Sequence, residues 1–138
     1  MKLTWLTILF VMLAAPLHAQ ETEDVTVTQL LSSTTTSSGQ PVVLPQKDAQ
    51  IVVSIYDVMP GATLPAHNHP HPRYAYVLSG MLRVNNIDTG QIDTYAPGDF
   101  ILESVGQWHA DKSIGSAPLK LLVIDFVDKG QPNVVPLK

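Results

Sequence analysis

Histidines at alternate positions in the middle of the chain are the residues best suited to chemistry. Residues 65–73 read Pro-Ala-His-Asn-His-Pro-His-Pro-Arg, which places His67, His69 and His71 two residues apart. In an extended strand, residues two apart project from the same face, so the imidazoles of His67 and His69 can reach one point. Neutral imidazole is a common ligand of Fe, Zn, Cu and Ni. The spacing therefore predicts a chelating pair for a divalent metal, on a segment that its prolines stiffen.

A second polar cluster lies downstream, where residues 108–111 read Trp-His-Ala-Asp. His109 and Asp111 share a face if this segment is a regular strand. The sequence contains no Cys, which excludes thiolate metal sites, thiol nucleophiles and disulfides. A metal centre in this chain would use imidazole and carboxylate ligands.

The elements that must position these residues are strands. Runs rich in β-branched and aromatic residues, several of them alternating apolar and polar, are separated by turn residues such as Pro-Gly and Ser-Gly. These runs cover residues 25–28, 51–58, 74–78, 81–84, 91–95, 100–102 and 119–127. Residues 32–39 are small and polar, which indicates a loop or a weak edge strand. Because no sustained helical period follows residue 20, the pattern predicts an all-β sandwich or barrel.

The chain is long enough for one domain, preceded by a targeting segment. Residues 1–19 combine an early Lys, a short apolar run and a small-residue exit at Ala19, which is typical of a secretory signal peptide. A retained N-terminal anchor is the alternative, although the apolar run is shorter than the roughly 20 residues that span a bilayer. We expect N-terminal strands and a polar loop over residues 20–49, and a barrel over residues 50–138. A cleaved signal peptide predicts a periplasmic or secreted protein without membrane attachment.

Composition narrows the class of partner. Hydrophobic residues make up 45% of the chain and charged residues 14%, which favours a folded domain over a disordered chain. The net charge is −4 and no basic stripe is present, so nucleic acid is not expected as a partner. Residues 131–138 include two prolines and could pack on a neighbouring subunit, which would make a homodimer. A small molecule remains the expected ligand.

Two motifs resemble those of the cupin superfamily, over roughly residues 50–127. The first family motif is Gly, five residues, His-x-His, three or four residues, Glu, six residues and Gly. In this chain Gly61 is followed by five residues and then by His67 and His69, and the motif ends at Gly80.

The second family motif centres on Pro-Gly-Asp with a His ten residues after the Asp. Residues 97–99 read Pro-Gly-Asp, and His109 follows at that spacing. The resemblance implies a double-stranded β-helix (jelly-roll) barrel in which His67, His69 and His109 hold one divalent metal, which could be Fe, Mn, Zn, Ni or Cu. The pattern is similar to small exported cupins of unassigned activity.

One residue departs from the family pattern. Arg73 stands where cupins usually have their Glu ligand, and guanidinium is not a metal ligand because it stays protonated. The site is therefore either a three-histidine site or takes a carboxylate from elsewhere. Glu103 is the first candidate, because it follows an apolar strand and a tight turn joins it to His109. Asp111 is the second and His71 the third.

Each of these residues also has a structural interpretation. Glu103 could be a rim carboxylate paired with Arg73 or Arg83, and Asp111 could be a solvated residue at a strand end. Arg73 could bind a substrate carboxylate or form a surface ion pair. The residues that could line a substrate pocket are Arg73, Tyr74, Tyr76 and Trp108. Aromatic side chains in barrels are more often core packing.

The leading functional hypothesis is a metal-dependent enzyme that oxidises, isomerises or decarboxylates a small molecule, anionic if Arg73 binds it. Glu103 or Asp111 would move the proton as catalytic residues. The alternatives are a non-catalytic periplasmic module that binds a metal or small ligand, and a structural barrel without metal. A closed four-ligand site would favour binding, whereas an open site beside Arg73 would favour catalysis.

Overall fold

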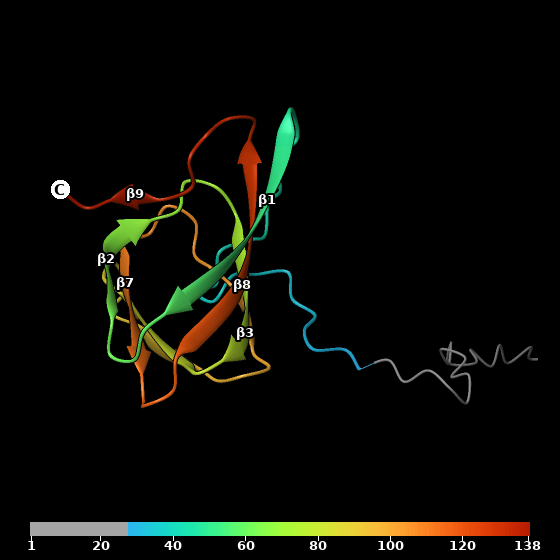
Figure 1. The fold of residues 1–138 in the computed structure, drawn as a ribbon. Coiled ribbons are helices and arrows are strands. Elements are labelled where there is room, and N and C mark those ends of the chain that lie inside the picture. Colours follow the sequence, from blue (N-terminus) through green and yellow to red (C-terminus); the bar gives the residue numbers. More distant parts are fainter. Residues whose placement is uncertain (1–27) are drawn as a thin grey trace, which may run out of the picture.

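The computed structural model describes residues 28–138, which form two antiparallel β-sheets (Figure 1). The strands are β1 (Ala49–Val58), β2 (Thr63–Asn68), β3 (Arg73–Ser79), β4 (Met81–Asn86), β5 (Ile92–Tyr95), β6 (Phe100–Leu102), β7 (His109–Ile114), β8 (Leu119–Asp128) and β9 (Val135–Pro136). One sheet has the order β1-β8-β3-β6 and the other the order β5-β4-β7-β2-β9. The all-β prediction is confirmed. Within residues 28–138 there is no helix long and apolar enough to cross a membrane.

The core lies between the two sheets, and strand alternation selects its residues. In β8, every second residue from Leu119 to Val127 is buried, while the residues between them are more exposed. The main buried cluster is Ala75, Val77, Leu82, Ile101, Leu119, Leu121 and Val123. Because side chains two apart share a face, the inner face of β3 also includes Arg73, whose side chain is buried.

The strands expected from sequence patterns between residues 51 and 127 are present as β1, β3, β4, β5, β6 and β8. Residues 25–27 and the proposed signal peptide lie outside the described residues. Residues 28–48 contain no strand, apart from an isolated bridge between Thr35 and Pro41, so the polar segment 32–39 is a loop.

The C-terminal tail packs on its own chain. β9 pairs with β2, with Pro136 opposite His67 and Val135 opposite Asn68, and Figure 1 shows the tail running beside β2. The edge of β2 within the same barrel pairs with residues 135–136, and the expectation that the tail also packs on a neighbouring subunit stays a prediction.

Candidate metal centre

The three histidines named by the motifs lie together inside the barrel. His67 is in β2, His69 follows the end of β2, and His109 begins β7 opposite His67 in the β2–β7 pairing. Their ring centroids are 4.4 to 4.9 Å apart, and one nitrogen from each ring lies within 4.8 Å of the others. All three residues are at most 5% exposed. Two distant stretches of sequence thus bring three imidazoles to one buried point.

Backbone carbonyls set the orientation of all three rings. Each imidazole has its Nδ1 within hydrogen-bond distance of a carbonyl oxygen. The pairs are His67 with Pro65 (2.7 Å), His69 with Asn133 (2.5 Å) and His109 with Gln107 (3.0 Å). Because a carbonyl oxygen can only accept, each Nδ1 carries the proton and each neutral ring keeps its lone pair on Nε2. Metal-bound histidines commonly show this arrangement, with the second ring nitrogen donating to an outer partner.

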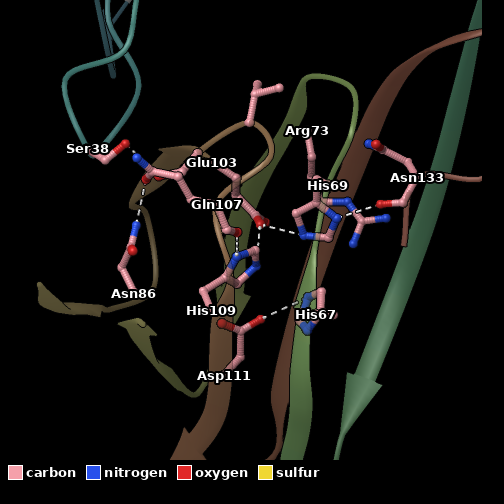
Figure 2. A network of polar contacts seen from close by, with 12 residues as sticks. Ser38, His67, His69, Arg73, Asn86, Glu103, Gln107, His109, Asp111 and Asn133 are labelled. Atoms are coloured by element: carbon pink, nitrogen blue, oxygen red, sulfur yellow. Dashed lines mark hydrogen bonds and ion pairs between the residues drawn. The ribbon is translucent and has the colours of Figure 1, made fainter. Parts of the chain in front are cut away.

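A carboxylate lies at the same point. Glu103 Oε2 is 3.0 Å from His69 Nε2 and 3.6 Å from His109 Nε2, and Figure 2 shows this carboxylate between the two rings. Both of these Nε2 atoms are buried and have no hydrogen-bond partner among the described residues. Lone pairs that face a carboxylate oxygen repel it, and a cation between them would remove that conflict. Imidazole nitrogens and a carboxylate oxygen are a donor set that suits divalent transition metals, so these residues fit such an ion.

Asp111 lies on the same face of β7 as His109, beside His67. Its Oδ2 is 3.8 Å from His67 Nε2 (Figure 2), and its Oδ1 is buried without a hydrogen-bond partner among the described residues. Asp111 is 8% exposed and is therefore not a solvated strand-end residue. Its distance from the ring of His67 places it at the margin of the cluster.

Burial and neighbouring groups shift the pKa values of His67, His109, Asp111 and Glu103. Burial lowers the pKa of His67 to about 4, against the opposing effect of its hydrogen bond to Pro65, and burial also lowers the pKa of His109. Burial and the nearby charge of Glu103 raise the pKa of Asp111 to about 8. Burial alone would raise the pKa of Glu103, but the close approach of His69, 3.0 Å away, and the charge of Arg73 lower it. These shifts favour neutral His67 and His109 and an ionised Glu103, as metal ligation requires.

Arg73 forms a buried ion pair rather than a surface one. Its Nε donates to Asp125 Oδ1 at 2.7 Å and its Nη2 donates to Asp125 Oδ2 at 2.9 Å. Asn133 Nδ2 also donates to Asp125 Oδ1, at 2.6 Å. Burial works against the charge of Arg73, but the bond to Asp125 and the charge of Glu103 raise the pKa of Arg73. The partner of Arg73 is thus Asp125, a residue that sequence reasoning did not single out.

The remaining predicted site residues are not part of the histidine cluster. Tyr74 and Tyr76 are on the opposite face of β3 from Arg73, where their rings contact Phe100. His71 borders a surface hollow with Val105 and is not part of the cluster. Trp108 is half-buried just before β7, and its backbone N–H donates to Asp88.

Two cavities border the cluster on different sides. A cavity of about 230 Å³ is lined mainly by apolar side chains, including Val134 and Pro136, and reaches His67, Arg73 and Tyr56. On the side of Glu103 and His109, a cavity of about 20 Å³ has room for about one water molecule. Ser37 and Ser38 of the N-terminal loop line this smaller cavity.

Sequence reasoning missed the contribution of both flanking segments. Asn133, in the tail, accepts a hydrogen bond from His69 Nδ1–H at its backbone carbonyl and donates one to Asp125 through its side-chain amide. Ser37 and Ser38, in the N-terminal loop, close one side of the centre. No motif or periodicity marks these residues, because their role arises from contacts between segments far apart in sequence.

Comparison with known proteins identifies the family, since the cupin domain family matches residues 54–125. The chain belongs to the cupin family. Cupins with solved structures share the fold at low identity. The polyketide cyclase RemF from Streptomyces resistomycificus is 24% identical, with a TM-score of 0.54, over 67% of this chain and 65% of that one. Among proteins with curated functions, none matches the sequence.

Two oxalate decarboxylases are also similar to this cupin. The Bacillus subtilis enzyme is 20% identical with a TM-score of 0.57, over 65% of this chain and 24% of that one. The Lactobacillus farciminis enzyme, solved as a formate complex, is 21% identical with a TM-score of 0.55, over 63% and 26%. Mn(II) centres are described for the Bacillus subtilis enzyme. This cupin spans about a quarter of each decarboxylase chain, so the likeness shows the fold and carries no activity with it.

Proposed function

We propose that this cupin is a metal-dependent enzyme that oxidises, isomerises or decarboxylates a small molecule. The observation that carries the proposal is the set of three buried Nε2 lone pairs and one carboxylate around a single point. His67, His69, His109 and Glu103 would hold one divalent ion, which could be Fe, Mn, Zn, Ni or Cu. When bound, the ion would supply Lewis-acid polarisation of a substrate oxygen.

The apolar cavity beside His67 favours catalysis over storage or binding of the metal alone. It gives a small molecule access to the side of the cluster bordered by His67 and Arg73. A non-catalytic metal site has no need of such an opening. The apolar walls would supply most of the binding energy and would exclude water from the reacting atoms.

The state of Arg73 bears on the substrate class. Because two of its N–H groups are committed to Asp125, a substrate in this cavity meets a compensated charge rather than a free cation. We therefore propose a neutral or singly charged substrate with an apolar body and one oxygen, such as a phenol or an enolisable ketone. A small dicarboxylate is disfavoured, because its second charge would have no partner.

Asp111 is the group placed to hold or move a proton. Its Oδ1 is buried, unpaired among the described residues and next to His67, which borders the cavity. Glu103 is enclosed by two rings and serves better as a ligand. We also propose export to the periplasm or medium, on the sequence of the first 19 residues.

A metal-loading experiment with paired variants tests the proposal. The purified protein is loaded separately with each of the five metals, and phenols, enolisable ketones and small carboxylates are screened for turnover and oxygen uptake. We expect His109→Ala to lose both the metal and the turnover, and His71→Ala to keep both, because His71 lies outside the cluster. Metal retained in His109→Ala would refute the site. If the wild-type protein binds metal but turns over none of these compounds, the enzymatic proposal is wrong and the non-catalytic binding module is supported instead.

A further inference from the structure

Glu103 is carried by a segment that has no strand to hold it. It lies in the six residues that connect β6, which ends at Leu102, to β7, which begins at His109. Two backbone hydrogen bonds tie this connection to neighbouring segments near the histidines: Glu103 N–H donates to Arg73 O and Gly106 N–H donates to His69 O. A ligand on such a segment needs further contacts, because a free connection would lose conformational entropy on metal binding.

The N-terminal loop supplies these contacts on both sides of Glu103. The backbone N–H of Ser37 donates to Leu102 O at 2.9 Å, and Ser104 Oγ donates to Ser38 Oγ at 2.8 Å. Figure 2 shows the loop with Ser38 next to the segment that bears Glu103. The residues before and after the carboxylate are therefore both fixed from the same loop.

Gln40 makes the most complete of these contacts. Its Nε2 donates to Val105 O at 2.8 Å, and its Oε1 accepts from Val105 N–H at 2.8 Å. One side chain thus satisfies both backbone groups of Val105, as a neighbouring strand would. The loop is itself held closed, because Thr36 N–H donates to Gln40 O at 2.8 Å and Gln40 N–H donates to Thr36 Oγ1 at 3.1 Å.

We propose that Gln40 is a positioning residue for Glu103, so that the loop of residues 36–40 is a working part of the metal centre. The proposal rests on the metal centre proposed above and adds to it residues 36–40, which lie outside the matched range 54–125. Arg73 occupies the usual position of the carboxylate ligand. The relocated carboxylate of Glu103 therefore depends on the loop of residues 36–40.

The affinity of the purified protein for Zn²⁺, measured by competition with a chelator of known affinity, tests the role of Gln40. We expect Gln40→Ala to raise the dissociation constant by about 10- to 100-fold, the usual effect of removing a residue that orients a ligand. Gln46→Ala is the matched control, because its side chain is exposed and bonds only to Leu44 O nearby, and its affinity should stay unchanged. Gln40→Glu can still accept a hydrogen bond from Val105 N–H but cannot donate one at neutral pH, so its dissociation constant for Zn²⁺ should lie between those of the wild type and Gln40→Ala.

A double-mutant cycle separates positioning from general stability. In a Glu103→Gln background, Gln40→Ala should weaken Zn²⁺ binding no further, since the group that it positions is gone. The Co²⁺-loaded Gln40→Ala variant should also show an absorption spectrum close to that of Glu103→Gln. Equal losses in both backgrounds, or no loss in either, would overturn the proposal.

Two further variants keep the outcomes distinct. If Gln40→Ala does not fold, Ser38→Ala removes one contact of the same loop and should raise the dissociation constant by a smaller factor. If His109→Ala loses the metal while Gln40→Ala and Ser38→Ala bind as tightly as wild type, the loop proposal alone is wrong. If His109→Ala keeps the metal, the centre itself is wrong.

Discussion

Replacing Arg73 with Met tests the interpretation of the residue that departs most clearly from the family pattern. The structure makes Arg73 one half of a buried ion pair with Asp125, joined by hydrogen bonds of 2.7 and 2.9 Å. The substitution keeps much of the side-chain volume and removes the charge. Asp125, which is 6% exposed, would keep only the hydrogen bond from Asn133.

The expected cost follows from that arrangement. An unpaired buried charge left by the loss of its partner destabilises a protein by about 3 to 5 kcal/mol. Replacing both members, as Arg73→Met with Asp125→Leu, removes the charge as well as the pair. The remaining cost is then about 1 to 3 kcal/mol, for the donor of Asn133 left without an acceptor.

Urea unfolding of the metal-free protein measures these free energies, so that changes in metal affinity do not enter. The exposed pair of Lys120 with Asp57, 3.2 Å apart, provides the control, and Lys120→Met should cost about 0 to 1 kcal/mol. A cost below about 1 kcal/mol for Arg73→Met, or a double variant less stable than Arg73→Met alone, would refute the reasoning.

Three further predictions concern the turn between β3 and β4, the pH dependence and the tail. Gly80→Ala should fail to fold or lose several kcal/mol of unfolding free energy in urea, because the new Cβ would lie 2.6 Å from the backbone of Leu119. Gly61→Ala has open space around its new Cβ and should lose only about 1 to 2 kcal/mol, for its positive φ. Between pH 6.5 and 8, the free energy of unfolding measured in the presence of chelator should fall by up to about 1.4 kcal/mol per pH unit, because Asp111 is protonated in the folded protein and ionised in the unfolded chain. Below pH 6.5 the lowered pKa of His67 has the opposite effect on the slope. An unchanged slope in Asp111→Asn would contradict this origin. Asn133→Ala should weaken Zn²⁺ binding, measured by chelator competition, by less than tenfold, because His69 bonds to the backbone carbonyl of this residue and the substitution keeps that carbonyl. Deletion of residues 131–138 removes the carbonyl and should weaken binding more. Equal effects of the two changes would show that the carbonyl is unimportant.

Sequence patterns predicted the strands well where burial alternates. In β3 and β8 one face is buried against the opposite sheet, so apolar residues recur at every second position and their period reveals the strand. The same period placed His67 and His69 on one side. Arg73 and Tyr74 are adjacent in β3, however, and the alternation that buries Arg73 turns Tyr74 to the outer face.

The site was less accessible from sequence because its other parts come from irregular segments. The position of Glu103 depends on a connection without strand period, and the spacing of residues between β6 and β7 does not say which way a side chain turns. The role of Asn133 depends on β9 pairing with β2, and that of Gln40 on contact with Val105. Contacts between residues 65 positions apart leave no local pattern that a reader of the sequence could detect.

Anomalous scattering from crystals of the metal-loaded protein tests the central claim most directly. The account predicts one peak per chain at the absorption edge of the metal, bonded to Nε2 of His67, His69 and His109 and to the carboxylate of Glu103. A peak bound elsewhere, or none at these four residues in a protein that holds stoichiometric metal, would contradict it.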